Sequence, residues 1–203
     1  MSASRTRPAS TSTSPSQVDE AYRSLRSTVK FAAGDTPVRS VLVVDIDRDE
    51  TSVVAARLAD AFAEAGDRCV LIDTDARATG GQDAGFFDLL AGANAETSTR
   101  SGSGAAWVGP GRSGSPDALA SEAFSAALEH LTEAHETAVL SCAPLPKFAD
   151  ALAIAPRVDA VVLVVTAGST RRPRAVEARE ALDRVGARIL GVVMIEPKKR
   201  WFW

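Results

Sequence analysis

Carboxylates gather where two apolar runs of this 203-residue sequence end. The run Val41–Val44 leads into the acidic turn, defined here as residues 45–50, and the run Cys69–Ile72 leads into Asp73-Thr74-Asp75. Each run has the composition of a strand covered on both faces, and the carboxyl ends of parallel strands form the ligand-binding edge of open α/β sheets. Carboxylates at that edge can hold magnesium or accept a proton. Asp73 and Asp75 are therefore candidates for a metal site together with the acids of the turn.

The acidic turn reads Asp45-Ile46-Asp47-Arg48-Asp49-Glu50 and precedes a helix that starts at Thr51. A turn that holds phosphates is normally rich in glycine and carries a lysine, because bare N–H groups and a cation must face the anion. This turn has neither. A like-charge pair about 5 Å apart at an effective dielectric near 20 costs roughly 3 kcal/mol, so several such pairs offset much of the binding energy of a micromolar nucleotide. We predict a nucleotide-binding architecture whose site is closed.

The carboxylates also have a structural interpretation. Asp47, Asp49 or Glu50 can accept bonds from the free N–H groups that open the helix, worth about 0.5–2 kcal/mol, and would then stand where a phosphate would bind. Asp73 and Asp75 can likewise cap the turn that follows their strand. Two other interpretations stay open, namely a metal site that joins all these acids and residual nucleotide binding.

The composition describes an ordinary globular protein. The chain is 45% apolar and 24% charged, with a net charge of −3, which favours one domain and gives no reason to expect nucleic-acid binding. The two cysteines, Cys69 and Cys142, fall in predicted strands and suggest buried, reduced thiols of a cytoplasmic protein. No run approaches the ~18 apolar residues of a membrane span. Residues 1–16, rich in Ser, Thr and Pro, are predicted to be a disordered leader before a domain over 17–196.

Helical and strand patterns alternate along that domain. The helices are predicted over 17–33, 51–66, 86–91, 116–119, 121–134, 150–155 and from Pro173 to Gly186, and the strands over 38–44, 69–72, 105–108, 137–141, 160–165 and 188–195. Because each parallel strand pair needs a crossover, the expected fold is α/β, a three-layer, mostly parallel twisted sheet with helices on both faces.

The order of these parts resembles the cytoplasmic domain of bacterial tyrosine kinases of capsule and exopolysaccharide export, in the MinD- and ParA-like group of P-loop ATPases. The resemblance covers nearly all of residues 17–195. It is carried by Glu20–Arg26, Val38–Val43, Ala55–Ala59, Val70–Arg77, Gly85–Gly92, Ala149–Leu152 and Gly191–Val193.

Several site residues that the resemblance implies have changed. The lysine of the phosphate loop falls on Thr51 and its glycine on Glu50, while Ser52 keeps the hydroxyl that would ligate magnesium. Asp73 and Asp75 match the second acidic motif, which serves magnesium and phosphate-acceptor chemistry in the family. The aspartate of the third acidic motif falls on Ser141, and the asparagine that contacts adenine falls on Ile195.

The pattern that the resemblance links to ring-shaped self-association is intact as Glu20, Arg23 and Arg26, although a solvated helix face would look the same. The tyrosine-rich tail of such kinases is missing, and Tyr22 is the only tyrosine. The chain ends instead in a basic and aromatic tail over residues 197–203, which suits an anionic membrane surface or a groove on a partner unless it is merely a frayed end. Its candidate contact residues are Lys198, Lys199, Arg200, Trp201, Phe202 and Trp203.

The resulting hypothesis is a non-catalytic relative of the kinase domain, without a cofactor, that regulates or scaffolds polysaccharide synthesis and export. Its expected partners are a kinase paralogue or further copies of itself and a membrane protein of chain-length control or export, which would place it in the cytoplasm at the inner face of the membrane. The first alternative is a divergent ATPase or tyrosine kinase that uses ATP and Mg²⁺, with Arg48 replacing the lysine. The second is a ParA- or MinD-like positioning protein.

Overall fold

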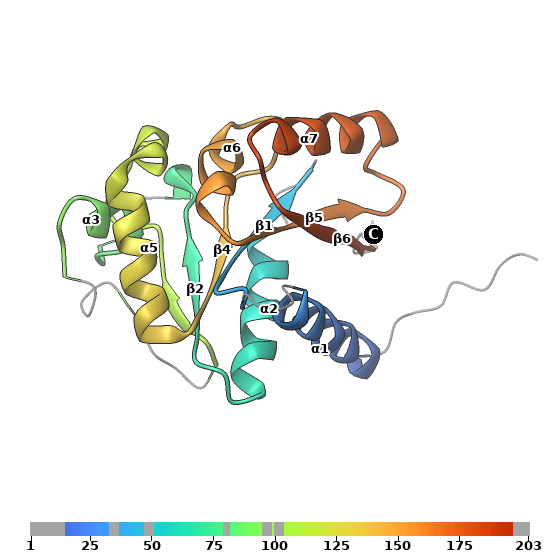
Figure 1. Cartoon of the computed structure of the whole chain (residues 1–203), viewed down its shortest axis with the longest axis horizontal. Helices are drawn as coiled ribbons and strands as arrows, with labels where there is room; N and C mark the ends of the chain where they lie inside the picture. The colour runs from blue at the N-terminus through green and yellow to red at the C-terminus, as the bar shows by residue number, and fades with distance from the viewer. Residues whose placement is uncertain are drawn as a thin grey trace, which may run out of the picture.

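Six parallel strands form one sheet in the computed structural model, which describes residues 15–32, 37–46, 51–78, 82–94, 99 and 104–196 (Figure 1). The strand order is β3-β2-β4-β1-β5-β6, and every neighbouring pair is parallel. The strands are β1 Ser40–Asp45, β2 Cys69–Asp73, β3 Ala106–Val108, β4 Thr137–Ser141, β5 Ala160–Thr166 and β6 Ile189–Ile195. The predicted strands are confirmed to within one or two residues, except that Cys142 lies just after β4 instead of within it.

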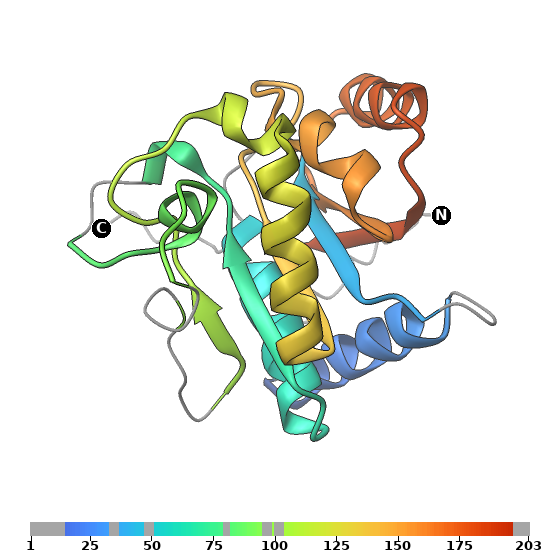
Figure 2. The same cartoon turned by 60° about the vertical axis from the view of Figure 1, so that its left-hand side comes forward.

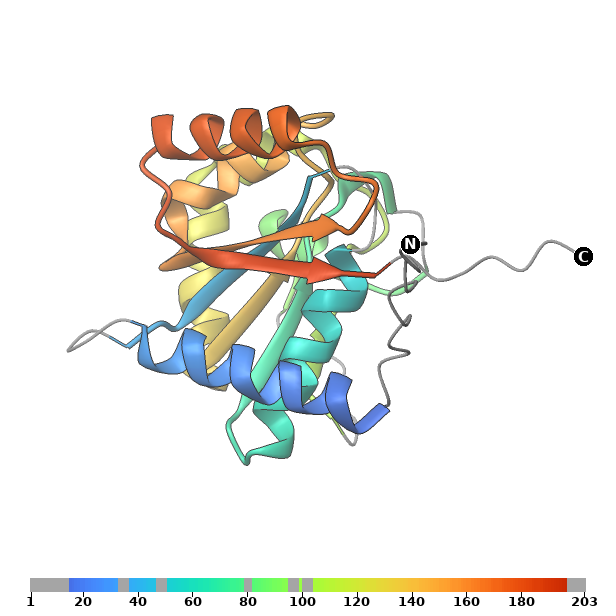
Figure 3. The ribbon, with the colours of Figure 1, turned by 90° about the vertical axis from the view of Figure 1, so that its right-hand side faces the viewer.

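Helices cover both faces of this sheet (Figures 2 and 3). Two of them, α1 Pro15–Phe31 and α2 Thr51–Glu64, pack on one face. The other face carries α3 Phe86–Leu90, α5 Glu122–His135, α6 Asp150–Ile154 and α7 Arg172–Arg184, with short 3₁₀ turns at Ala76–Ala78, Pro116–Ala120 and Ala155–Arg157. The three-layer α/β fold predicted from the sequence is confirmed.

Alternation along the strands assigns side chains to the two cores. In β1, Val41 and Val43 join the core beneath α1 and α2, whereas Leu42 and Val44 join the larger core on the opposite face. All six residues of β1 are buried, as expected for a central strand covered on both faces. The same holds for β4 and β5.

Two apolar residues assigned to helix interiors lie outside them. The apolar spacing in the sequence predicts that Phe31 and Val176 extend the inward stripes of their helices, but Phe31 is 76% exposed and Val176 is 44% exposed. Each lies two positions from a fully buried residue of the same helix, Val29 and Ala178 respectively. Two positions correspond to roughly 200° around a helix, so both side chains project from the opposite side.

A buried carboxylate in α3 joins the start of that helix to the loop that follows β3. Asp88 Oδ2 accepts hydrogen bonds from the backbone N–H groups of Gly85 at 3.0 Å and Arg112 at 2.9 Å, and Asp88 Oδ1 accepts one from Arg112 Nε at 2.8 Å. Gly111 has φ +102°, and a Cβ there would come within 2.3 Å of Asp88 Oδ2. Burial alone would raise the pKa of Asp88, but the hydrogen bonds from Arg112 and Gly85 outweigh it and lower that pKa.

We expect Asp88→Asn to lower the free energy of unfolding by about 1–3 kcal/mol at pH 7, because it weakens bonds to a buried charged acceptor. Since the folded-state pKa of Asp88 is lowered, its contribution is complete above the ordinary aspartate pKa and is lost as the pH falls through the folded value. Urea denaturation at pH 7 and at about pH 3 should therefore show a smaller difference between wild type and variant in acid. An equal difference at both pH values would contradict this account.

Candidate functional site

The carboxyl ends of β1, β2 and β4 bring the predicted site residues to one edge of the sheet. Asp73 of β2 lies opposite Ser141 of β4, which in turn lies opposite Val43 of β1. Asp45 ends β1 and is fully buried, and its carbonyl accepts a hydrogen bond from Leu145 N at 2.9 Å. The strand order thus brings together Asp45, Asp73 and Ser141, the serine on which the third acid was expected to fall.

Thr74 ties the end of β2 to the end of β4. Its hydroxyl donates to the carbonyl of Ser141 at 2.7 Å, and its backbone N–H donates to the same oxygen at 2.9 Å. Asp73 Oδ1 accepts from Asp75 N at 3.0 Å, which fixes the turn that follows the strand. Thr74 is fully buried and is a positioning residue that the sequence analysis did not single out.

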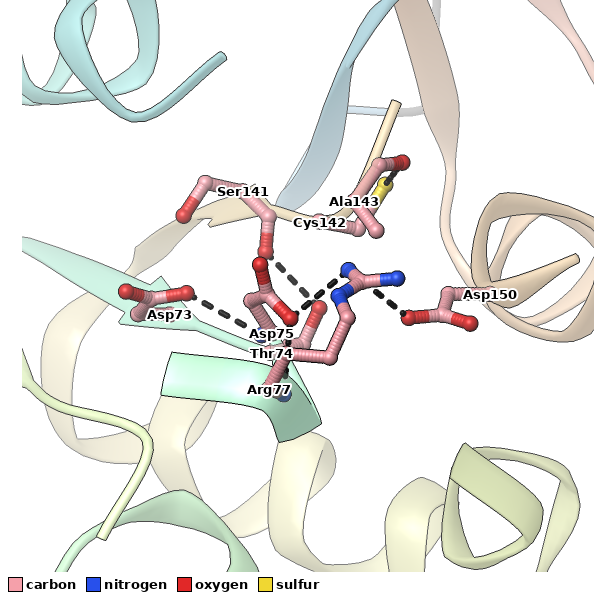
Figure 4. A network of polar contacts seen from close by, with 8 residues as sticks. All are labelled: Asp73, Thr74, Asp75, Arg77, Ser141, Cys142, Ala143 and Asp150. Atoms are coloured by element: carbon pink, nitrogen blue, oxygen red, sulfur yellow. Dashed lines mark hydrogen bonds and ion pairs between the residues drawn. The ribbon is translucent and has the colours of Figure 1, made fainter. Parts of the chain in front are cut away.

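A cluster of four side chains, which we call the Arg77 cluster, lies beside this turn and consists of Asp75, Arg77, Phe148 and Asp150. Arg77 Nη2 lies 2.7 Å from Asp75 Oδ1 and 3.5 Å from Asp150 Oδ2, so one guanidinium bridges two carboxylates (Figure 4). Asp75 Oδ1 also accepts from Arg77 N at 2.8 Å. The guanidinium stacks on the ring of Phe148, with Cζ 3.5 Å from the ring centroid.

The charges in the Arg77 cluster oppose one another. Burial raises the pKa of Asp150, Arg77 counteracts the rise, and Asp75 adds to it, with a net upward shift. Burial also raises the pKa of the neighbouring Cys142 thiol strongly, helped by Asp150 and Asp75. Cys69 is buried as well, and its pKa is raised to about 12. Both thiols stay protonated at neutral pH and are unsuited to nucleophilic chemistry.

Asp73 and Asp75 provide the hard oxygen donors that magnesium prefers, and Mg²⁺ sites commonly use one or two carboxylates. The described residues contain no cluster of three His, Cys, Asp or Glu side chains that could hold a metal ion. Arg77 is already bonded to Asp75, and Asp73 is bonded to the turn. The two aspartates therefore match magnesium in donor chemistry, but the cation that contacts Asp75 is the chain's own arginine.

Other predicted site residues are only partly covered by the structure. Residues 47–50, which are Asp47, Arg48, Asp49 and Glu50, lie outside the described residues, as does the tail over 197–203. Thr51 and Ser52 form the first turn of α2, but their side chains are not among those described. Ile195 ends β6, where its carbonyl accepts from Ala167 N at 2.8 Å.

The predicted self-association residues lie on α1. Arg23 Nη1 pairs with Glu20 Oε2 at 3.1 Å, and both side chains are well exposed. Arg26 is half-buried, and its Nε is shielded from solvent without a hydrogen-bond partner among the residues described here. A buried guanidinium N–H that lacks an acceptor is costly.

Two solved structures share the architecture at 12–14% sequence identity. The cobyrinic acid a,c-diamide synthase of Mycobacterium smegmatis, solved with ADP and magnesium, matches with a TM-score of 0.60 at 14% identity, covering 77% of this chain and 74% of that one. A plasmid partition protein of Borrelia burgdorferi matches with a TM-score of 0.59 at 12% identity over 81% and 83% of the two chains. The fold is thus P-loop NTPase-like. No protein-family profile matches the sequence.

Closer similarity is to bacterial tyrosine kinases, as the sequence motifs indicated. The tyrosine-protein kinase YwqD of Bacillus subtilis is 27% identical over 188 residues, 86% of this chain and 79% of the relative. The putative tyrosine-protein kinase CapB of Staphylococcus aureus is 24% identical over 194 residues, 88% and 84% of the two chains. The kinase domain of Escherichia coli ETK superposes with a TM-score of 0.82 at 18% identity, over 92% and 79%. The resemblance to exopolysaccharide tyrosine kinase domains is confirmed. None of the helices in the described residues is long and apolar enough to cross a bilayer.

Replacing Arg77 tests the compensation within the Arg77 cluster. Arg77→Met should lower the free energy of unfolding by about 1–3 kcal/mol at pH 7.5, because it leaves two carboxylates without their shared cation. The pKa of Asp150, already raised, should rise further without Arg77, so the folded variant takes up a proton as the pH falls and regains stability toward pH 5. Urea denaturation at both pH values measures this change.

Arg179→Met is the matched control, since Arg179 pairs with Asp183 at 3.4 Å on the exposed surface of α7. Its effect should stay below about 0.5 kcal/mol at either pH. A cost for Arg77→Met that is equally small, or that does not shrink toward pH 5, would show that Arg77 does not compensate these carboxylates.

Proposed function

We propose that this chain is a non-catalytic homologue of the exopolysaccharide tyrosine kinase domain and acts as a regulatory or scaffolding subunit in capsule or exopolysaccharide synthesis and export. The observation that carries the proposal is the make-up of the carboxyl edge of the sheet. Asp73 and Asp75 lie there beside Ser141, on which the resemblance puts the third acid, and the sequence lacks the phosphate-loop lysine and glycine that the resemblance implies.

The electrostatics of this edge support the proposal. Asp45, Asp73 and Asp75 end or follow β1 and β2, and the sequence adds Asp47, Asp49 and Glu50. Arg77 is bonded within its cluster and Phe148 covers one face of its guanidinium. A nucleoside triphosphate would bring three or four further negative charges to this edge of the sheet, where the acids outnumber the cations. Its binding would be opposed, and the protein would act through contacts with other proteins.

The first alternative is an active ATPase or tyrosine kinase of the same pathway. Its support is the retention of Asp73 and Asp75, which would be the residues that hold Mg²⁺, together with Arg48 as a substitute cation. The metal would neutralise phosphate charge during transfer. ATP turnover that is lost in Asp73→Asn would favour this alternative. A ParA- or MinD-like positioning role shares the fold but requires nucleotide cycling, which the same charges oppose.

Two features support a scaffold. The α1 face exposes Glu20 and Arg23 beside the partly buried Arg26, whose Nε lacks an acceptor in the described part of the chain. A solved chimerical protein named CapA2B2 is 24% identical, with a TM-score of 0.81 over 91% of this chain and 86% of that one. Its name supports a partner subunit, for which the tail at Lys198–Trp203 is a second candidate contact.

Calorimetric titration with ATP and magnesium tests the closed site. We expect no binding tighter than about 10 µM, which corresponds to about −7 kcal/mol, because the carboxylates in the sequence of the acidic turn would oppose the phosphates. Asp73→Asn should give the same null titration. A tighter dissociation constant for the wild type, weakened by Asp73→Asn, would contradict the proposal and favour the enzyme.

Light scattering tests assembly through α1. The wild type should have a mass above the 21.2 kDa of one chain, and Arg23→Ala/Arg26→Ala should reduce it, because both guanidinium groups would contact the neighbouring copy. Arg179→Ala/Arg184→Ala on α7 is the matched control and should leave the mass unchanged. Equal masses for the wild type and the α1 variant would rule out this face as the contact.

A further inference from the structure

The strand β6 forms one outer edge of the sheet, and no strand of the described residues pairs with its free side (Figure 3). Its seven residues, Ile189–Ile195, include no charge and no proline. Edge strands of monomeric proteins are usually short, charged, bulged or interrupted by proline, which prevents pairing between molecules. The opposite edge strand, β3, has only three residues. An uncharged edge of this length is a pairing surface unless something covers it.

The backbone groups on the free side can be identified from the ladder to β5. The carbonyl of Ile195 accepts from Ala167 N at 2.8 Å, so Ile195 directs its backbone groups toward β5. Successive residues of a strand direct their N–H and C=O groups to opposite edges. Val192 and Met194 therefore direct theirs outward. Each offers one donor and one acceptor to an additional strand.

The same two residues carry the exposed apolar side chains of the strand. Val192 is 59% exposed and Met194 is 71% exposed, the second highest exposure among the large apolar side chains. Gly191 has open space around its Cα. Neither side chain is needed for the core, and both stand where a neighbouring strand would place its own side chains.

The register of an added copy follows from the irregularity in β6. The ladder to β5 shifts at Val161/Val162, so the regular part of β6 is Gly191–Ile195. An antiparallel copy related by a two-fold axis at Val193 pairs this regular part with itself. Val192 then lies opposite the partner's Met194, and Met194 opposite the partner's Val192. Both are hydrogen-bonded pairs, because all four residues direct their backbone groups across the edge.

The charges next to the strand favour the antiparallel orientation. Arg188 precedes β6 and Glu196 follows it, and both are exposed. In the antiparallel arrangement Glu196 lies diagonal to the partner's Arg188, within reach of two long side chains. A parallel copy in register would place like charges side by side at both ends.

We propose that the β6 edge binds a second copy of this chain, forming a two-fold antiparallel strand pair centred on Val193 that extends the sheet from six strands to twelve. The contact buries Val192 and Met194 against their counterparts and satisfies four outward backbone groups on each chain. The contact lies beside α1, whose Ser24, Leu25 and Thr28 line a hollow with Val192. It uses none of Glu20, Arg23 and Arg26, so it does not depend on the function proposed above.

A charge at the edge should break the contact. Sedimentation of the full chain at about 1–200 µM should show dimers in the Arg23→Ala/Arg26→Ala background, and adding Met194→Lys should weaken the dimer about tenfold or more. Trp107→Lys is the matched control, because Trp107 is 39% exposed and lies on β3, the edge strand at the other end of the sheet from β6. A monomer without the lysine, or a dimer that Met194→Lys does not weaken more than Trp107→Lys does, would overturn the proposal.

Cysteine cross-linking tests the register even if a lysine variant misfolds. Isotopically labelled Val192→Cys chains mixed with Met194→Cys chains should form mixed disulfides several times faster than either variant forms its own, since directly opposite Cβ atoms lie about 4.5–5.5 Å apart. The buried Cys69 and Cys142 leave the wild type uncross-linked. Faster linkage between identical variants would overturn the proposal, because in-register parallel pairing requires it. Absence of linkage would also overturn it, as expected if a peptide of another protein covers the edge.

Discussion

The bridge from Arg77 to Asp75 and Asp150 is the interaction on which the carboxyl edge of the sheet depends. Parallel strands bring their carboxyl ends together, so acids at those ends repel one another unless a cation lies among them. Arg77 supplies that cation from within the chain, at 2.7 Å from Asp75 and 3.5 Å from Asp150. An arginine stays protonated at any physiological pH, so this compensation is permanent. The compensating charge for Asp75 and Asp150 therefore comes from within the chain.

The strand ends are held by bonds within the chain. Around the strand ends, Thr74 and Asp73 fix the turn between β2 and the following 3₁₀ turn by bonds that leave little freedom. Among the described residues, buried polar atoms without a partner are Arg26 Nε on α1, Asp67 Oδ2 and Thr166 Oγ1 at the end of β5, and the outer edge of β6 has no strand beside it. Polar groups without partners and apolar side chains without cover are the usual properties of a surface that binds protein. Within the described residues, Arg26 and the outer edge of β6 have these properties.

The sequence was sufficient for the fold because each strand is specified locally. The runs at Val41–Val44 and Val161–Val165 are continuously apolar, and only a strand buried on both faces needs that pattern. The strand-end positions of Asp73 and Asp75 followed directly. Arg77, Phe148 and Asp150 could not be assembled in advance, because Arg77 and Asp150 are 73 residues apart and meet only when α6 packs beside β1. The sequence pattern did not predict the exposure of Phe31 and Val176, because an apolar residue faces the core only if its angle around the helix matches that of the buried residues.

The same electrostatics explain why cation and nucleotide binding must be considered together. A magnesium ion about 5 Å from the Arg77 guanidinium would be repelled by roughly 7 kcal/mol at an effective dielectric near 20. Asp73 and Asp75 can offset part of this cost, but Asp75 would first have to give up its bond to Arg77. In phosphoryl transfer, the remaining compensation comes from phosphate oxygens that bridge to the metal. The sequence Asp47-Arg48-Asp49-Glu50 falls where the resemblance puts the phosphate loop, and its three carboxylates would oppose those phosphates. Magnesium and nucleotide would thus each need the other in order to bind. The carboxylates of the acidic turn would make binding of the nucleotide, which carries the negative charge, less favourable.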